Sequence, residues 1–220
     1  YRDSVYVYAG LGESDAALAT YTRTGAFVRA TLCGGSQSDR ATTAALASDG
    51  LALGGRFRDA ASLGSTTVNA DADTAFFIAK CDFSGRFRWA TAAPGELRAL
   101  AVSPSGLIYA AGVFYGLTQV GGFSLTAADP GVGEIFLVVF DAKGVAKDAQ
   151  RGGGPGPDGA RAIVFETNST ARIAADAYNV RAYRDDGSPV FNNADFGARV
   201  IIAPFANRRY AFVARLCRTL

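Results

Sequence analysis

Residues 75–95 read AFFIAKCDFSGRFRWATAAPG. The stretch joins an apolar run, a polar turn that closes with Gly85, a second run, and Gly95 ten residues after the first glycine. A short polar turn closed by glycine suits a β-hairpin, because glycine reaches positive φ without steric cost. The flanking runs are short, and aromatic residues dominate them, which favours strands over helices. The stretch therefore predicts neighbouring strands joined by a tight turn.

The same layout recurs along the chain, each time with ten residues between two glycines. The pairs are Gly25 with Gly35, Gly85 with Gly95, Gly144 with Gly154, and Gly187 with Gly197. A further apolar run, a turn and another strand follow each pair, so every period holds four short strands. Successive first glycines lie 60, 59 and 43 residues apart. No segment of ten or more residues has the apolar period of a helix.

Four-stranded units at this spacing are typical of a β-propeller. We expect a single all-β domain over residues 1–220, a β-propeller with four or five four-stranded blades. A β-sandwich would explain the strands but not the repeated glycine spacing. The expected repeat units are residues 16–57, 75–114, 134–177 and 178–216, with a leading strand at residues 4–9.

The leading strand leaves the closure of the ring open. One blade could combine N-terminal and C-terminal strands and so close the ring. Alternatively, the leading strand is surplus, and the chain belongs to a larger ring or pairs with a neighbouring subunit, as an exposed edge rich in valine and tyrosine invites. The chain begins at Tyr1 rather than Met, from which we expect a processed product or a fragment.

Two longer insertions follow the fourth strand of their units. They are Arg58 to Thr74 and Tyr115 to Gly133, both containing stretches rich in glycine, serine and threonine that predict loops. Both leave the same type of strand, so we expect them to project from one face of the molecule. Loops at the ends of a propeller usually carry its ligand contacts.

The segment Ala75–Ala90 resembles the bacterial SBBP-type β-propeller repeat. In that family an apolar strand ending in Ala-Lys-x-Asp-x-x-Gly precedes a Trp-Ala pair, matching Ala79 to Gly85 and then Trp89-Ala90. The resemblance covers about Ala41 to Gly144. The third copy has Asp148 where Trp89 stands, and the fourth has Arg181 where Ala79 stands. The resemblance implies an extracellular or cell-envelope propeller and supplies no catalytic residues.

Composition excludes several classes of function. The chain has 220 residues, 49% of them hydrophobic, a formal net charge of +2 and no histidine. Without histidine there are no His-based triads and almost no zinc or copper sites. The scattered charges form no basic stripe for nucleic acid, and no apolar run is long enough for membrane insertion.

The remaining candidate residues are a disulfide pair and a glycosylation sequon. Cys81 aligns with core positions of other copies, so we expect a buried thiol there. If the termini meet in one blade, a bridge between Cys33 and Cys217 would staple the ring. Asn168-Ser169-Thr170 is an N-glycosylation sequon on a predicted turn, where Asn168 would be exposed.

Other motifs predict ordinary structure. The glycine-rich segment Arg151–Gly159 lacks a phosphate-loop ending, and Asp71 and Asp73 lack the further ligands of a calcium loop. We therefore expect no catalytic, cofactor-binding or metal-binding residues. Arginines cluster in copies one and two and mark either solvated strand faces or a surface patch for acidic glycans. They are Arg23, Arg29, Arg56, Arg58, Arg86, Arg88 and Arg98.

The sequence thus predicts a non-catalytic, secreted or cell-surface recognition module that binds a protein or glycan ligand and requires no cofactor. The first alternative is a structural subunit of an extracellular fibre or sheath, which self-associates by pairing strands at blade edges. A weaker alternative is a propeller hydrolase that uses carboxylates.

Overall fold

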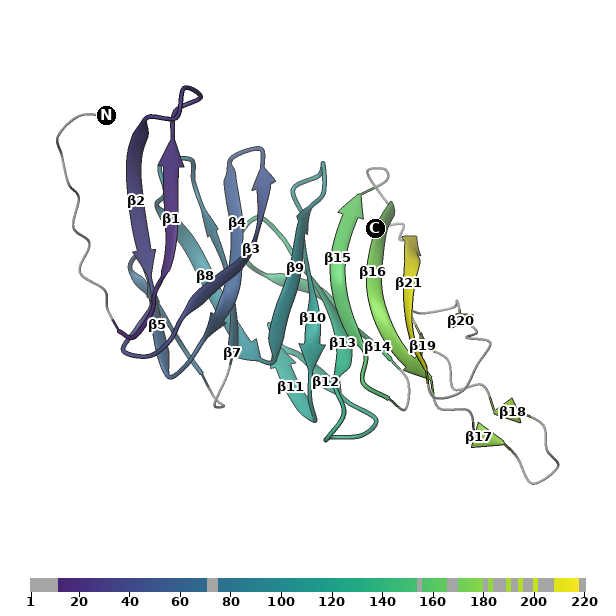
Figure 1. Cartoon of the computed structure of the whole chain (residues 1–220). Coiled ribbons are helices and arrows are strands. Elements are labelled where there is room, and N and C mark those ends of the chain that lie inside the picture. Colours follow the sequence, from purple (N-terminus) through teal and green to yellow (C-terminus); the bar gives the residue numbers. More distant parts are fainter. Residues whose placement is uncertain are drawn as a thin grey trace.

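The computed structural model describes residues 12–70, 75–153, 156–165, 170–179, 182–183, 189–190, 194–195, 200–201 and 208–217. Within these ranges the chain forms strands and turns and no helix, so the prediction of an all-β protein is confirmed (Figure 1). The predicted leading strand, residues 4–9, lies outside the described part.

The strands that build the main sheets are short and follow one another along the chain. They are β1 (Ala16–Tyr21), β2 (Phe27–Cys33), β3 (Arg40–Ala47), β4 (Gly50–Phe57), β7 (Ala75–Cys81), β8 (Phe87–Pro94), β9 (Glu96–Val102), β10 (Ile108–Phe114), β13 (Glu134–Phe140), β14 (Ala146–Gly152), β15 (Gly159–Phe165), β16 (Thr170–Asn179) and β21 (Arg208–Cys217). The remaining strands form small hairpins: β5 (Ala60–Leu63), β6 (Thr66–Asn69), β11 (Leu117–Val120), β12 (Phe123–Thr126), β17 (Ala182–Tyr183), β18 (Pro189–Val190), β19 (Ala194–Asp195) and β20 (Val200–Ile201).

Antiparallel pairing groups the main strands into sheets in chain order. We call β1-β2 sheet I, β3-β4-β7-β8 sheet II, β9-β10-β13-β14 sheet III and β15-β16-β21 sheet IV. The repeat units expected from sequence do not coincide with these sheets. The unit at residues 16–57 combines β1 and β2 of sheet I with β3 and β4 of sheet II, so the sheet boundary is displaced by two strands.

The sheets stack face to face in a row, with sheet I at one end and sheet IV at the other (Figure 1). Ala52, Phe76 and Ile78 of sheet II pack against Leu97 and further apolar residues of sheet III. The opposite face of sheet III packs on sheet IV, and the opposite face of sheet II packs on sheet I.

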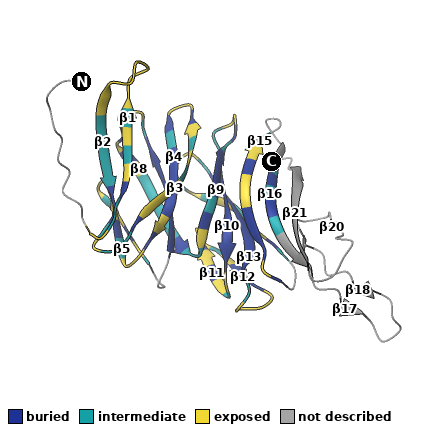
Figure 2. Ribbon diagram, viewed as in Figure 1, coloured by how far each residue is buried: buried dark blue, intermediate teal, exposed yellow. Residues whose placement is uncertain are grey.

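The central strands β7, β10 and β13 are buried along their whole length, because apolar layers cover both faces (Figure 2). Their continuous apolar sequences follow from this placement, since only a strand with one solvated face alternates. The row has two ends, and none of the described sheets closes on itself. The structure thus confirms the strand-rich class without containing the predicted ring.

The glycine turns share one geometry. In the segments Thr22–Ala26, Asp82–Arg86, Ser103–Leu107 and Asp141–Val145, the fourth residue is a glycine with φ of +85°, +73°, +86° and +83°. Its N–H donates to the carbonyl of the first residue at 2.8–3.0 Å, and the side chain of that first residue accepts from the N–H of the fifth. Threonine, aspartate or serine at the start and glycine near the end are therefore required by the turn itself.

The ten-residue gap between glycines has a structural cause. After each turn, the outer strand (β2, β8 or β14) spans most of the interval, and the chain then crosses to the next sheet. A Cβ on Gly35 would lie 1.8 Å from the carbonyl oxygen of Ala60, and one on Gly95 would lie 2.6 Å from that of Val113. The second glycine thus allows the chain to pass close to a neighbouring backbone at the crossing.

Asp141 provides a test of the turn. Its Oδ1 accepts from the N–H groups of Lys143 and Val145, its Oδ2 lies 2.9 Å from Lys147 Nζ, and these interactions lower the pKa of the carboxyl. The lysine contact contributes most. A carboxyl with a lowered folded-state pKa stabilises the fold above its unfolded pKa of about 3.9, and this stabilisation is lost as the pH falls.

We expect Asp141→Asn to lower the Tm at pH 7, and the difference from the native chain to shrink as the pH falls below about 4. Thermal melts followed by circular dichroism between pH 3 and 7 measure this. Asp148→Asn serves as the control, since it removes the same charge from the strand beyond the turn. A difference that stays constant with pH would contradict the role of the ionised carboxylate.

The two insertions are hairpins rather than the predicted loops. In the first, β5 pairs with β6, and Ala61, Leu63 and Val68 belong to the core between sheets I and II. In the second, β11 pairs with β12 through a turn at Gly121-Gly122, both with positive φ. Both hairpins lie along the same edge of the row, the lower edge in Figure 1, as predicted, and we call this edge of the stacked sheets the hairpin end.

Each hairpin connects neighbouring sheets. The N–H of Ser62 donates to the carbonyl of Gly34 at 2.8 Å, and the N–H of Gly34 donates to the carbonyl of Ser62 at 3.1 Å. In the second hairpin, Thr118 Oγ1 donates to the carbonyl of Pro94 in sheet II at 3.0 Å. The insertions are thus part of the packed structure, and their removal would open the core.

Candidate functional site

Crossings of similar geometry lead into sheets II and IV at the hairpin end. In the first, the N–H of Asp39 donates to the carbonyl of Ser14 at 2.7 Å; in the second, the N–H of Asp158 donates to that of Gly133 at 2.8 Å. Both aspartates are buried, at 1% and 4% exposure. A cavity lies beside each crossing, and we call the cavity next to Asp39 pocket A and the cavity next to Asp158 pocket B.

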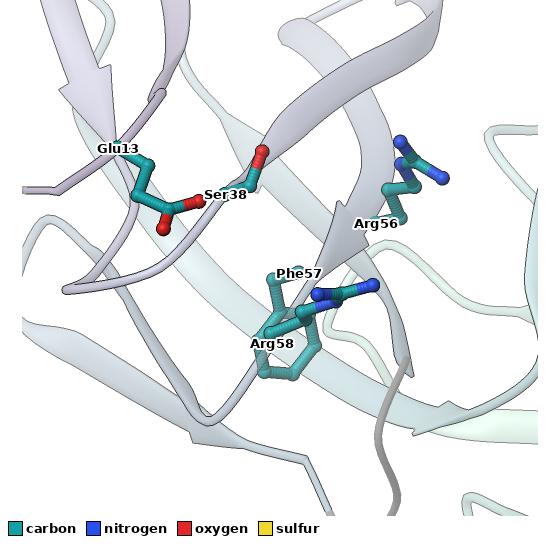
Figure 3. Close-up of a pocket in the computed structure, with 5 residues that line it drawn as sticks. All are labelled: Glu13, Ser38, Arg56, Phe57 and Arg58. Carbon is teal, nitrogen blue, oxygen red and sulfur yellow. The ribbon is translucent and has the colours of Figure 1, made fainter.

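Pocket A has a volume of about 220 Å³ and is lined by Glu13, Ser38, Arg56, Phe57 and Arg58. Small-molecule pockets usually enclose about 300–1,000 Å³, so this one suits a single charged group or part of a larger ligand. Figure 3 shows Glu13 directed toward Ser38, while the guanidinium groups of Arg56 and Arg58 point away from Glu13. The pocket thus presents its positive charges on one side.

Asp39 fixes the backbone of pocket A. Its Oδ2 accepts from the N–H of Gly35 at 2.6 Å, and its Oδ1 accepts from the N–H of Arg58 at 3.3 Å. Burial raises the pKa of the Asp39 carboxyl, and the nearby charge of Asp15 also raises it. The hydrogen bond to Arg58 ties the end of β4 to the crossing and so positions the Arg58 side chain.

Arg40 stands directly opposite Arg56 in the register of β3 and β4, and all of Arg40, Arg56 and Arg58 are exposed. Between the last two, Phe57 is fully buried against Phe77, with ring centroids 6.4 Å apart. Among the described residues, no carboxylate oxygen lies within 4.0 Å of the guanidinium nitrogens of these arginines. We call Arg40, Arg56 and Arg58 the arginine cluster.

Pocket B has the same volume, about 220 Å³, but different electrostatics. Its lining includes Arg98 and Arg161, each an additional residue at a β-bulge where β9 or β15 shifts register. Arg98 bonds Glu96 at 2.9 Å, and Arg161 Nε bonds Asp176 Oδ2 at 2.7 Å. Carboxylates of the protein therefore neutralise Arg98 and Arg161 in pocket B, whereas none of the described carboxylates neutralises the arginines of pocket A.

The arginines grouped from sequence do not form a single patch. Arg56, Arg58 and Arg98 lie at the hairpin end, whereas Arg29 and Arg88 contact the turn at Asp82–Arg86 at the other end. Arg29 Nη2 donates to the carbonyl of Phe83, and Arg88 pairs with Asp82 at 2.7 Å.

Arg29 and Trp89 form equivalent hydrogen bonds between neighbouring sheets. Arg29 on β2 bonds the second residue of the turn in sheet II, and Trp89 Nε1 on β8 donates at 2.9 Å to Ala142 O, the second residue of the turn in sheet III. The Trp89 ring also contacts Phe140, with centroids 6.1 Å apart. Trp89, a main feature of the family resemblance, therefore joins neighbouring sheets.

The cysteine predictions have different outcomes. Cys81 is fully buried, as predicted. Cys33 is a free and buried cysteine, and burial, with smaller contributions from Cys81 and Asp15, raises the pKa of its thiol to about 12. The thiol therefore remains protonated and unreactive. Since β2 and β21 lie at opposite ends of the row (Figure 1), the arrangement gives no support to a disulfide between Cys33 and Cys217.

Other candidates fall partly or wholly outside the described residues. Asn168 lies outside them, and the strands before and after it, β15 and β16, pair antiparallel. Asp71 and Asp73 also lie outside them. The glycine-rich segment Arg151–Gly159 connects β14 to β15, as expected of an inter-strand connection.

The described part of the chain contains neither a cluster of metal ligands nor a membrane-spanning helix. No group of three or more cysteine, aspartate or glutamate side chains is arranged there to hold a metal ion. That part also contains no helix long and apolar enough to cross a membrane.

Comparison of the chain with protein-family models and with curated proteins finds no match. The geometry of the hairpin end is therefore the basis for interpreting the site.

Sequence reasoning missed Arg40 and the two crossings. A detectable signal existed for the crossings: Gly34-Gly35 precedes Asp39, and Gly153-Gly154 precedes Asp158, with the same spacing in both places. Arg40 carried no local signal, because its proximity to Arg56 depends on the register between β3 and β4.

Proposed function

We propose that the chain is a non-catalytic recognition module of β-propeller type, secreted or displayed at the cell surface, that binds its ligand at the hairpin end. The observation that carries the proposal is the pair of related pockets beside the crossings at Asp39 and Asp158, both at the hairpin end of the stacked sheets. Propellers usually recognise ligands at one end of their blades.

The stacking supports the propeller part of the proposal. Chain-ordered antiparallel sheets with both faces covered are what successive blades require, and β3, β9 and β15, the first strands of their sheets, pack beside one another. The resemblance of residues 75–90 to the SBBP-type repeat supports an extracellular setting. Asn168 as a glycosylation site and the blade number remain predictions.

The test is a screen of oligosaccharides and peptides for saturable binding, followed by hydrogen–deuterium exchange with the best ligand. We expect slower exchange at residues 56–70 and 113–120 and no change at the turns 82–86 and 141–145. Slower exchange confined to those turns, or no saturable binding, would contradict the proposal.

A second candidate is self-association at the end of the row. The outward face of sheet I exposes Tyr21 (59%) and Val28 (51%), which a further sheet could cover. Light scattering at several concentrations separates the two candidates. A constant mass near the 22.8 kDa of the chain supports the recognition module. A mass that rises with concentration, and falls again in Val28→Asp, supports assembly.

A further inference from the structure

The geometry points to an anion-binding site at the arginine cluster, and we infer that it takes an acidic glycan through its carboxylate or sulfate groups. This inference rests on the proposed function and assigns its ligand class and contact residues.

The first argument is the register. Arg40 and Arg56 are Cα partners in neighbouring antiparallel strands, so their side chains leave the same face of the sheet with Cβ atoms about 5 Å apart. Like charges in directly opposite positions destabilise a sheet. Arg58, two residues beyond Arg56, continues the same side. A fold that tolerates this repulsion does so most readily where a ligand neutralises it.

The second argument is the supply of nearby carboxylates. Asp39 is committed to backbone N–H groups, and Glu96 is bound to Arg98. The Glu13 side chain is directed toward Ser38, and the guanidinium groups of Arg56 and Arg58 point away from it (Figure 3). Asp59 follows Arg58 in sequence without forming an ion pair with it. With respect to the described residues, the cluster therefore keeps its planar donors available, and such donors match carboxylate and sulfate oxygens in pairs.

Pocket B provides an internal comparison. The bulge arginines there, Arg98 and Arg161, are held by Glu96 and Asp176. The two crossings share their backbone geometry, so the difference between the pockets lies in the side chains. Only pocket A combines a cavity with arginines that no carboxylate of the described residues neutralises.

The surroundings favour a glycan over a protein partner. Protein interfaces depend on aromatic and apolar anchors at their centre. At the cluster, Phe57 is fully buried, and none of the exposed large apolar side chains of the described residues belongs to the lining of pocket A. The accessible groups are guanidinium donors and the side chains of Ser38 and Glu13, a polar surface suited to a charged and hydroxylated ligand.

The experiment measures the dissociation constants of a sulfated heparin hexasaccharide and a hexagalacturonate, with maltohexaose as the neutral control. We expect both acidic probes to bind and the neutral probe to bind at least about tenfold more weakly, and we expect added salt to weaken the acidic complexes. Whichever acidic probe binds more tightly identifies sulfate or carboxylate as the preferred group.

The variants are the double change Arg40→Gln/Arg56→Gln and the control Arg88→Gln, at an arginine that lines neither pocket. We expect the double variant to bind the acidic probes at least about tenfold more weakly, because it loses charge-assisted hydrogen bonds. Its Tm should be unchanged or raised, because the repulsion between the two arginines is removed. The control should stay within about twofold, since Arg88 is bound by Asp82 at the opposite end of the strands.

Several results would overturn the inference. One is that the double variant binds the acidic probes as tightly as the native chain. Another is that Arg88→Gln loses as much affinity for them as the double variant, which would indicate non-specific attraction. Tighter binding of hexaglutamate than of either acidic saccharide would reject the glycan class. If a ligand still protects the hairpin end while the double variant binds it normally, the inference fails and the proposed function stands.

Discussion

Replacement of Gly112 by alanine is expected to lower the free energy of unfolding by about 3 kcal/mol, close to the upper end for overpacking. A Cβ at this position would lie 1.9 Å from the carbonyl oxygen of Glu96 and 2.8 Å from the Phe136 ring. The oxygen belongs to the paired strand β9 and cannot move without breaking the bulge beside it. The change therefore disturbs sheet III at its centre.

Replacement of Gly55 in sheet II is expected to have the same effect. Its Cβ would lie 1.9 Å from the carbonyl oxygen of Arg40 and 2.8 Å from the ring of Phe77. Gly55→Ala should thus cost about as much as Gly112→Ala, because the two sheets repeat the same bulge and the same aromatic contact. It would also shift the backbone of Arg40 and so disturb the arginine cluster.

Gly106→Ala is the matched control. Gly106 has φ of +86°, and no atom lies within 4 Å of the position that a Cβ would take, so alanine there meets backbone strain of about 1–2 kcal/mol and no clash. Urea unfolding at one pH, followed by tryptophan fluorescence, measures all three variants. If Gly112→Ala lowers the free energy of unfolding no more than Gly106→Ala does, the close approach of β9 and β10 is contradicted.

The turns were predictable because their chemistry is local. Asp82 and Gly85 lie within one turn, and each contributes a side-chain acceptor or a positive φ that the sequence alone reveals. The glycine gap was found for the same reason, although its cause, the close crossing at Gly35 and Gly95, needed the structure.

The grouping of strands into sheets depends on non-local pairing, and the expected repeat units are offset from the sheets by two strands. The apolar runs of β4 and β7 do not reveal from sequence whether each strand lies at the edge of a sheet or in its interior. The hairpins were missed because strands such as Ala60–Leu63 have four residues, too few for a clear alternation. Their buried side chains are small or separated by threonine and serine, as in a loop.

Only part of the candidate site could be predicted from the sequence. Arg56 and Arg58 were singled out, but alongside Arg88, which belongs to the opposite end of the sheets. Arg98 is neutralised by Glu96, two residues away, but the other arginines depend on neighbours distant in sequence. Arg161 lies 15 residues from the Asp176 that binds it, while Arg56 has a second arginine opposite. Pairing register, which sequence patterns do not specify here, decides the charge of each pocket.

The stacking of sheets II and III is expected to depend on Phe76 and Phe136. Their rings stack with centroids 4.8 Å apart and an interplanar angle of 13°, and both side chains are fully buried. Phe76 comes from β7 and Phe136 from β13, so the contact joins one sheet to the next. Phe76→Ala or Phe136→Ala should each lower the free energy of unfolding by about 3–5 kcal/mol through lost burial and the cavity left behind.

The double variant distinguishes a contact between sheets from two independent losses. Because each change removes the partner of the other, the two should be less than additive, with a coupling of about 0.5–1.5 kcal/mol. Phe83→Ala, at a side chain that is 56% exposed, is the control and should cost less than about 0.5 kcal/mol. If the two core variants prove strictly additive in urea unfolding, the rings do not interact in solution. Neighbouring sheets would then be less tightly packed than successive propeller blades require, and the propeller part of the proposed function would lose support.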